Sequence, residues 1–344
     1  MAIGMIPYIF LFVIVIFLAK LGQKRKIFRV LLFIVMSLFV GLRRGVGTDY
    51  EEYSNLYVFQ GDYLEAGFSY ILLLLNQYGF SVTWFFFVIA AMSYFFMYKA
   101  VETTPVFKRF SVLVMLSLLS LSFLCNGIRQ GLAICIFLYA FHFIQERKAI
   151  PYFVCIMLAF LFHKSILIAI PLYFLSDNYL SKRLYILIYL ISFVFCTIDL
   201  NTLLGPIASI LESNRRYSNL MSNDSGAGYL SLGVLLEMSN YVVLVLIATK
   251  KEIFKKQALL FNMVFIAAVL MNMRVGAPLM NRVLTMFAWF CYPMIPLILD
   301  SVSARNRQPL KWFFIITYTL STVKYIFFDE KSLMYPYHDA LGVF

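Results

Sequence analysis

Long apolar runs recur from one end of this 344-residue chain to the other, and they constrain the fold more than any other feature. Hydrophobic residues make up 62% of the sequence and charged residues only 13%, and the mean hydropathy is +0.84. Soluble domains carry roughly 25% charged residues, whereas a helix needs about 20 apolar residues to cross the hydrocarbon core of a bilayer. We therefore predict an all-α polytopic membrane protein.

Basic clusters between these runs predict the orientation of the chain, because lysine and arginine gather in cytoplasmic loops. With residues 20–29, 99–109 and 250–256 in the cytoplasm, about twelve transmembrane helices follow and both termini lie outside. Residues 67–80 are apolar but short, so we expect there a helix that lies on the outer surface or re-enters the membrane. The predicted spans are 5–20, 27–42, 82–100, 110–125, 128–145, 149–162, 164–177, 183–200, 230–249, 257–273, 283–300 and 310–327.

The same placement predicts a single domain over residues 1–344, with outer loops at 42–81 and 201–229. It leaves seven arginines but only three lysines on the outer side, against the usual charge bias. Arginine offers a planar fork that matches phosphate and carboxylate oxygens, which lysine lacks. We expect some of these arginines to bind a polyanionic group, with pairing to outer carboxylates as the alternative. The outer arginines are Arg43, Arg44, Arg129, Arg215, Arg216, Arg274 and Arg282.

A polar stretch at residues 43–53, RRGVGTDYEEY, lies between two apolar runs on the outer side. Charge at a membrane boundary is costly unless it is solvated, paired or used in function. Gly45 and Gly47 allow the backbone to fold tightly around Asp49, which is a candidate catalytic base. Tyr50 is a candidate for stacking on a sugar ring, although an interfacial tyrosine is the plainer interpretation.

His163 and Lys164 lie together at the boundary between two short apolar runs. A histidine can act as a general base or donate to phosphate near neutral pH, and Lys164 can supply charge to the same anion. The alternative is an interfacial pair without chemistry. Arg274 and Arg282 flank a turn between two later spans, and Glu237 falls in the outer half of a span, where it should pair with an arginine or line a cavity.

The sequence gives no reason to expect a metal ion, a cofactor or a nucleic-acid partner. Its five cysteines lie in apolar runs without a CxxC pair, so they indicate neither a metal site nor a disulfide framework. The net charge of +12 suggests anionic partners, but the positive-inside bias accounts for much of it.

Several short motifs, in order along the chain, resemble those of the EpsG family of Wzy-like polysaccharide polymerases. They are Arg44-Gly45-Val46-Gly47-Thr48-Asp49-Tyr50 with Tyr53, Glu65-x-Gly67-Phe68, Gly127-x-Arg129-Gln130-x-x-Ala133 and His163-Lys164-Ser165, followed by Asn281-Arg282 before a late span. Residues 200–260 match no motif of that family.

The resemblance implies a polymerase with a glycosyltransferase-C-like membrane fold in the inner membrane of a bacterium. Such an enzyme joins oligosaccharide repeats carried on undecaprenyl pyrophosphate at the outer face, without a nucleotide sugar, to make O-antigen, capsule or exopolysaccharide. Its expected partners are the lipid-linked oligosaccharide, membrane lipid and a chain-length regulator protein.

On this view either Asp49 or His163 takes the proton from the acceptor hydroxyl, with His163 favoured because Asp49 beside two arginines should stay ionised. The expected substrate-binding residues are Arg43, Arg44, Tyr50, Glu65, Arg129, Lys164, Arg274 and Arg282.

Two other functions fit a polytopic protein with a basic outer face. A lipid-linked oligosaccharide flippase would use basic cavities too, but it should show two related halves, and none is visible in the sequence. A membrane O-acyltransferase would use an intramembrane histidine and arginine, but it needs a cytoplasmic acyl donor, and the inner loops here are short and basic.

Overall fold

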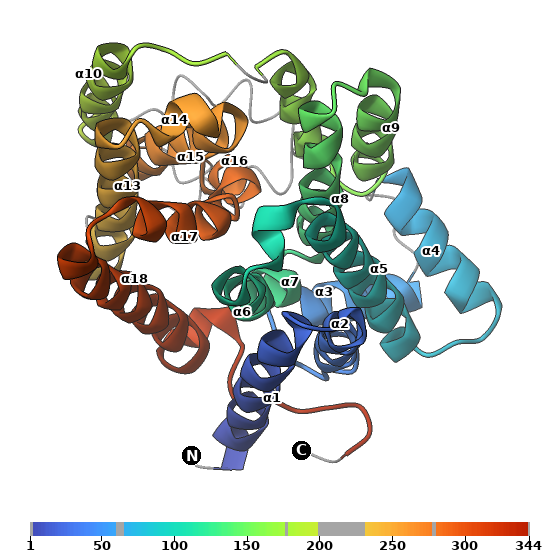
Figure 1. Ribbon diagram of the computed structural model, residues 1–344. Coiled ribbons are helices and arrows are strands. Elements are labelled where there is room, and N and C mark those ends of the chain that lie inside the picture. Colours follow the sequence, from blue (N-terminus) through green and yellow to red (C-terminus); the bar gives the residue numbers. More distant parts are fainter. Residues whose placement is uncertain (1–2, 60–64, 176–177, 199–230, 277–279, 343–344) are drawn as a thin grey trace. The chain divides into compact units, whose positions relative to one another are not determined.

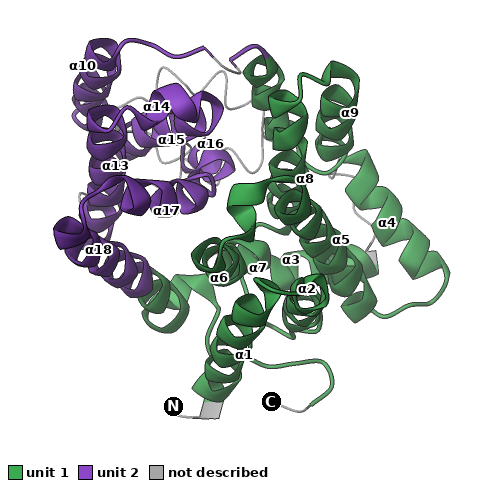
Figure 2. Cartoon of the chain, viewed as in Figure 1, with its two compact units in different colours: residues 1–173, 322–344 green, residues 174–321 purple. Residues whose placement is uncertain are grey.

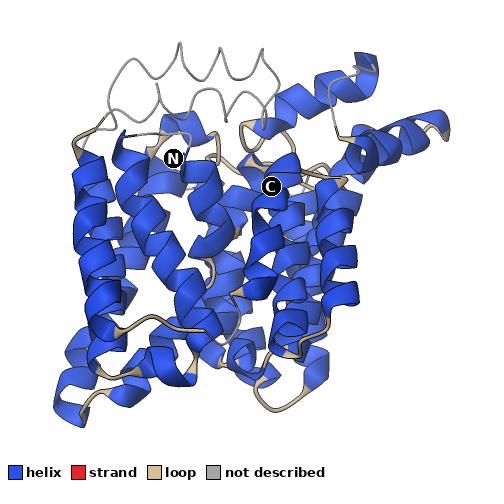
Figure 3. Cartoon of the chain, turned by 90° about the horizontal axis from the view of Figure 1, so that it is seen from above, coloured by secondary structure: helices blue, strands red, loops and turns tan. Residues whose placement is uncertain are grey.

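A computed structural model describes residues 3–59, 65–175, 178–198, 231–276 and 280–342. Within these ranges every regular element is a helix and there is no strand, apart from one isolated bridge between Arg43 and Asp339 (Figure 3). The all-α class predicted from the apolar runs is therefore confirmed. The predicted outer loop at 201–229 lies outside the described residues.

The chain divides into two compact units, which are described separately (Figure 2). Unit 1 comprises residues 1–173 together with 322–344, and unit 2 comprises residues 174–321. The last part of the chain thus returns to the unit formed by the first half. The single domain over 1–344 stays a prediction.

The described residues of unit 1 form nine α-helices (Figure 1). They are α1 (Ile6–Gly22), α2 (Lys26–Gly41), α3 (Asp49–Phe59), α4 (Ala66–Gln77), α5 (Val82–Thr103), α6 (Phe110–Leu119), α7 (Leu121–Asn126), α8 (Ile128–Gln145) and α9 (Ala149–Phe160). The unit also holds the 3₁₀ helices η1 (Ile3–Met5), η2 (Pro105–Lys108), η3 (Lys164–Phe174) and η6 (Glu330–Ser332), and the π-helix η5 (Lys324–Phe328).

The core of unit 1 is built around α8, which packs against α5 and α9, while α5 also packs against α2 (Figure 1). Nearly every side chain of α8 is buried, on all sides of the helix. A helix that is apolar all round is stable when other helices enclose it. Its few buried polar residues, Arg129, Gln130 and His142, are consequently the positions where this helix departs from apolar packing.

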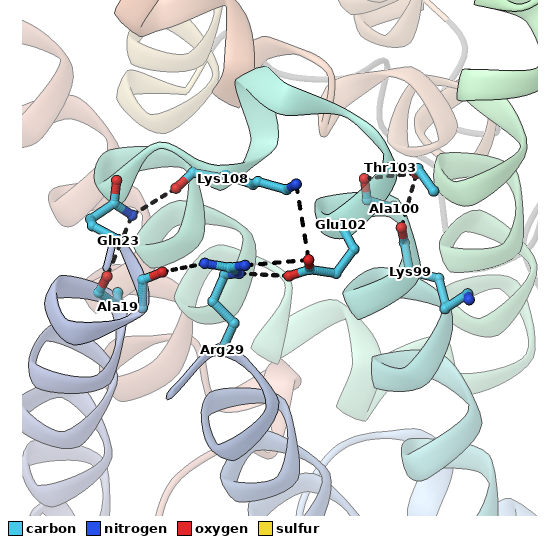
Figure 4. A network of polar contacts seen from close by, with 9 residues as sticks. Ala19, Gln23, Arg29, Lys99, Ala100, Glu102, Thr103 and Lys108 are labelled. Atoms are coloured by element: carbon cyan, nitrogen blue, oxygen red, sulfur yellow. Dashed lines mark hydrogen bonds and ion pairs between the residues drawn. The ribbon is translucent and has the colours of Figure 1, made fainter. Parts of the chain in front are cut away.

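An ion-pair network joins the first turn of α2 to the C-terminal end of α5 (Figure 4). Arg29 donates from Nε to Oε1 of Glu102 at 2.6 Å and from Nη2 to Oε2 at 3.3 Å, and it also donates to the carbonyl of Gly22. Nζ of Lys108, in η2, lies 3.9 Å from the same carboxylate. These residues belong to the clusters assigned to the cytoplasm, and their paired donors tie three segments together at one end of α5.

Unit 2 is also helical. It contains α10 (Lys182–Ser192), η4 (Phe193–Cys196), α13 (Leu232–Lys250), α14 (Ile253–Lys256), α15 (Ala258–Gly276), α16 (Met280–Ala288), α17 (Cys291–Ser301) and most of α18 (Ala304–Val323). Helix α15 packs against α13 and α16. Tyr185 of α10 donates to Asn262 of α15 at 2.6 Å, and Thr317 of α18 donates to Asn240 of α13 at 2.8 Å. These bonds satisfy polar groups inside an otherwise apolar unit.

Four described helices are long and apolar enough to cross a membrane, namely α5, α8, α13 and α15. The pair α16 and α17 adds a fifth if it forms one span, but the two helices meet at an angle of 51°. Together with the remaining apolar helices, these support a multi-pass membrane protein.

Three predicted segments differ in detail from what the sequence suggested. The range 164–177 is largely a 3₁₀ helix, η3, with Pro171 inside it. The range 283–300 is broken between α16 and α17. The loop predicted over 42–81 contains a complete helix, α3, in addition to the short helix expected near 67–80, which is α4.

Candidate functional site

Arg43 is one of the most buried side chains in unit 1, with 1% of its surface exposed. Its guanidinium donates to three backbone carbonyls, those of Val46 at 3.0 Å, Val40 at 2.5 Å and Cys125 at 3.4 Å. It also lies 4.7 Å from the ring centre of Phe86. Arg43 thus holds the loop that follows α2 against the turn between α7 and α8, and its substrate-binding role stays a prediction.

The next residues of the loop bring Asp49 to the start of α8. Gly47 has a φ of +87°, and a Cβ there would lie 2.5 Å from the carbonyl oxygen of Cys125. The backbone N–H of Thr48 donates to Oδ1 of Asn126 at 2.5 Å, and Oδ2 of Asp49 accepts from the backbone N–H of Ile128 at 3.0 Å. A carboxylate is stabilised at a helix N-terminus, where backbone N–H groups lack partners. Asp49 therefore fixes the first turn of α8.

The C-terminal tail lies along the same loop. Three backbone N–H groups donate to backbone carbonyls between the two segments. Gly47 donates to the carbonyl of Leu333 at 2.8 Å, Arg44 to the carbonyl of His338 at 2.9 Å, and Ala340 to the carbonyl of Leu42 at 2.7 Å. The side chain of Arg44 is exposed, so its guanidinium stays available to an anion. The tail thus supports the loop through backbone hydrogen bonds.

Three distant motifs of unit 1 meet at the carboxylate of Glu65, directly before α4. Nη1 of Arg129 donates to Oε2 of Glu65, and Nε of Arg129 donates to the hydroxyl of Tyr53 at 2.7 Å. Nδ1 of His163 lies 3.4 Å from Oε1 of Glu65, and the backbone N–H of Lys164 donates to the same oxygen at 3.4 Å. We call Tyr53, Glu65, Arg129 and His163 the Glu65 cluster.

Close backbone approach keeps Glu65 beside the His163 segment. The N–H of Gly67 donates to the carbonyl of Leu161 at 2.8 Å. A Cβ at Gly67 would lie 2.9 Å from both the side chain and the carbonyl oxygen of Leu161, so a larger residue would separate the two segments.

The cluster is buried and its charges are balanced. The side chain of Glu65 is 9% exposed and His163 is 5% exposed. Burial by itself raises the pKa of Glu65, but contact with the His163 ring and the charge of Arg129 outweigh it and hold that pKa at about 2. Burial raises the pKa of Tyr53 above its usual value. Glu65 is therefore a carboxylate and Tyr53 a neutral phenol at neutral pH.

Both ring nitrogens of His163 are buried and make no hydrogen bond within the described part of the chain. The 3.4 Å separation from Glu65 satisfies an ion pair, but its angles fall short of those of a hydrogen bond. Buried polar atoms almost always have a partner. The free Nε2 therefore marks a position that a ligand group can occupy. Lys164, the next residue, is exposed.

The other predicted site residues make contacts of their own. The ring of Tyr50 stacks on Phe86 with centres 4.7 Å apart. In unit 2, Nη1 of Arg274 donates to Oε2 of Glu237 at 2.9 Å and to Oδ1 of Asn281 at 3.2 Å. Glu237 therefore pairs with an arginine, which was one of the two roles predicted for it.

Arg282 lies in α16 and is partly exposed. Arg215 and Arg216 lie outside the described residues. Within the described ranges, no group of three or more His, Cys, Asp or Glu side chains is arranged to hold a metal ion.

Asn126 is a site-building residue that residue chemistry alone did not single out. Its Oδ1 accepts from the backbone and hydroxyl of Thr48, and its Nδ2 donates to the hydroxyl of Tyr325 at 2.9 Å. An amide directly before a glycine that starts a helix is a recognisable helix-start signal, and it was the one available clue.

A family comparison agrees with the resemblance found in the sequence. The EpsG family model matches residues 26–338. The chain belongs to the EpsG family. This EpsG-family protein is therefore a multi-pass membrane protein of polysaccharide biosynthesis, and the match includes the Glu65 cluster, Asp49, Arg274 and Arg282. No curated protein and no solved structure matches the chain.

Proposed function

We propose that this EpsG-family protein is a Wzy-type polysaccharide polymerase of the bacterial inner membrane. It transfers a growing glycan from undecaprenyl pyrophosphate to a new lipid-linked repeat at the outer face. The observation that carries this proposal is the convergence of Tyr53, Glu65, Arg129 and His163 in one buried cluster. Ionisable groups inside a membrane protein are rare, and they usually serve function.

The proposed membrane arrangement is the twelve-span, glycosyltransferase-C-like one. In it the shorter apolar helices cross together with the long ones. The polar network at Arg29 and Glu102 lies at the C-terminal end of α5, whereas Phe85 and Phe86, at its N-terminal end, contact Tyr57 and Tyr50 of α3. A 22-residue helix is about 33 Å long. This length supports a location on opposite membrane faces for the Arg29–Glu102 network and for the polar start of α3.

The reaction needs a base for the acceptor and a cation for the leaving group. The acceptor hydroxyl oxygen forms a bond to the anomeric carbon of the donor sugar while that carbon's bond to the diphosphate oxygen breaks. The leaving undecaprenyl pyrophosphate keeps the electron pair, and the hydroxyl proton goes to the base. Fixed positive charge near the diphosphate stabilises this developing charge.

His163 is the residue we assign as the base, because its ring is buried and Nε2 is free of any hydrogen bond among the described residues. A histidine is a suitable proton acceptor near neutral pH. Asp49 instead orients the first turn of α8, on which Arg129 lies. Arg129 is held by Glu65 and Tyr53, so the exposed Lys164 and Arg44 are the groups better able to reach a diphosphate.

A deletion strain complemented with His163→Gln tests the function. Its surface polysaccharide is analysed on gels, and its lipid-linked glycans are extracted. We expect single repeats on the carrier lipid, exposed outside and unpolymerised. His338→Gln is the matched control, because His338 is an exposed histidine of the same unit, and it should make normal polymer. If deletion leaves no repeats on the outer face, the protein is a flippase and the proposal is wrong.

A chain-length regulator protein is a further proposed partner of this polymerase. Co-purification of such a regulator with the tagged chain from the native membrane tests the association, and its absence after mild solubilisation and cross-linking would contradict it.

A further inference from the structure

Glu65 receives more polar contacts than any other side chain in the cluster, and these contacts come from two other segments of unit 1. One oxygen accepts from the guanidinium of Arg129 on α8. The other faces Nδ1 of His163 and the backbone N–H of Lys164, which lie directly after α9. Glu65 itself is the N-cap residue directly before α4. A single carboxylate thus sets the relative positions of an arginine and a histidine that are 34 positions apart in the sequence.

The geometry distinguishes the two nitrogens of His163. Nδ1 lies 3.4 Å from Oε1 of Glu65, whereas Nε2 has neither an ion-pair nor a hydrogen-bond partner in the described part of the chain. A carboxylate beside one nitrogen favours the proton on that nitrogen, which leaves the other with a lone pair. This arrangement of an acceptor, an imidazole and an orienting carboxylate is the one by which proteins prepare a histidine to take a proton.

We infer that Glu65 is a positioning residue for His163, one that keeps the proton on Nδ1, presents Nε2 to the sugar hydroxyl and stabilises the imidazolium once it forms. The inference rests on the proposed function for the identity of that hydroxyl. Arg129 then serves the base as well, because its bonds to Tyr53 and Glu65 prevent the carboxylate from turning away. The role differs from direct substrate binding, which the sequence suggested for both residues.

Charge supports the same assignment. Glu65 and Arg129 neutralise each other, so these two residues together leave no net charge in a buried place. When His163 takes a proton, the positive charge arises next to Glu65, at a distance where opposite charges attract strongly in a buried site. The other titratable and charged residues with contacts in the cluster are Tyr53, Glu65, Arg129 and Lys164, and Asp49 acts electrostatically on Tyr53. Glu51 and Glu52 on α3 and His142 on α8 are the other carboxylate and imidazole groups of the same helices.

The first test reads His163 directly, without any polymerase assay. Protein labelled with ¹⁵N-histidine, carrying His142→Gln and His338→Gln, leaves His163 as its only histidine. We expect a neutral ring protonated at Nδ1 in the membrane-reconstituted protein. Glu65→Gln should move the protonation midpoint of the ring by about 1 pH unit or more to lower pH, because both the lost carboxylate and the unpaired Arg129 disfavour the imidazolium.

A matched control separates this effect from a general loss of structure. Glu102→Gln also removes a carboxylate from a buried arginine of unit 1, at the other end of α5. It should leave the His163 spectrum unchanged. A proton on Nε2 in the unsubstituted ring, or an equal midpoint in Glu65→Gln and the parent protein, overturns the inference even if the polymerase proposal stands.

The second test uses activity on lipid-linked repeats extracted from cells that lack the protein. We expect Glu65→Gln to lower the polymerisation rate by about 10- to 100-fold and to move the acid limb of the pH–rate profile to lower pH. Glu65→Asp keeps the charge and should recover part of the rate. A rate loss with an unmoved acid limb assigns Glu65 a merely structural role. If the parent protein does not polymerise the repeats, the proposed function is wrong. The spectroscopic result then tests the pairing of Glu65 with His163 by itself.

Discussion

Replacing Gly47 with alanine tests whether the loop after α2 positions the site. Gly47 and Gly45 both have positive φ, +87° and +65°, so an alanine is strained at either position. They differ in space, since a Cβ on Gly47 would lie 2.5 Å from the carbonyl oxygen of Cys125, whereas a Cβ on Gly45 would meet nothing within 4 Å. Gly45→Ala is therefore a matched control for the backbone strain alone.

The room available to the added Cβ differs between the two positions, and this difference sets the expected loss of unfolding free energy for each variant. The backbone strain costs about 1 kcal/mol of unfolding free energy at either position. At Gly47 the loop must also move away from the turn between α7 and α8, which breaks the two hydrogen bonds that Thr48 donates to Oδ1 of Asn126, each worth about 1 kcal/mol. We expect a total loss of roughly 3 kcal/mol for Gly47→Ala. At about 2–4 °C per kcal/mol for a unit of this size, Tm falls by roughly 10 °C, against roughly 3 °C for Gly45→Ala.

A thiol-reactive dye follows this unfolding in detergent, because four of the five cysteines are buried and free. Polymer made in a complemented deletion strain reports the site at the same time. We expect Gly47→Ala to lose polymer at a temperature where it is still folded, because Asp49 leaves the start of α8, and Gly45→Ala to keep it. Equal Tm losses and normal polymer in both variants would refute the positioning role of this loop.

Three further outcomes follow from the structure. Arg129→Ala should abolish polymer while the protein still accumulates. Arg129→Lys should restore little polymer, because an ammonium group cannot bond to both Glu65 and Tyr53 as the guanidinium does. Normal polymer from Arg129→Ala would show that Arg129 is not part of the site. Glu102→Ala should lower the unfolding free energy by about 3 kcal/mol, because it leaves the buried Arg29 without its carboxylate partner. Activity per folded molecule should stay the same. An unchanged Tm would show that the Arg29–Glu102 ion pair does not stabilise the fold. In intact spheroplasts an impermeant reagent should label a cysteine placed at Glu52 but not one at Lys251, and the reverse pattern would invert the proposed orientation.

The sequence predicted the helices that depend on local composition. The apolar runs at 27–42, 82–100 and 128–145 became α2, α5 and α8 with ends within a few residues, because helix formation satisfies backbone groups within one segment. The same rule could not foresee α3, whose sequence, DYEEYSNLYVF, is polar at its start and was expected to be a loop.

Residue chemistry also found His163 and Arg129, since ionisable groups are conspicuous among apolar residues. It did not give their partners. Glu65 was one outer carboxylate among several and stood out only through the family resemblance, and Arg43 was expected to face substrate although its guanidinium is bonded to backbone carbonyls.

The sequence by itself therefore determined the membrane class, most helix positions and the ionisable residues available for chemistry. Only the tertiary structure decided which of them meet, because Arg129 pairs with a carboxylate 64 positions away and Lys164 reaches the same group across 99 positions. Helix position is set by interactions within a few residues along the chain. The pairing of charges is set by which buried helix faces pack together and by the need of every buried charge for a partner.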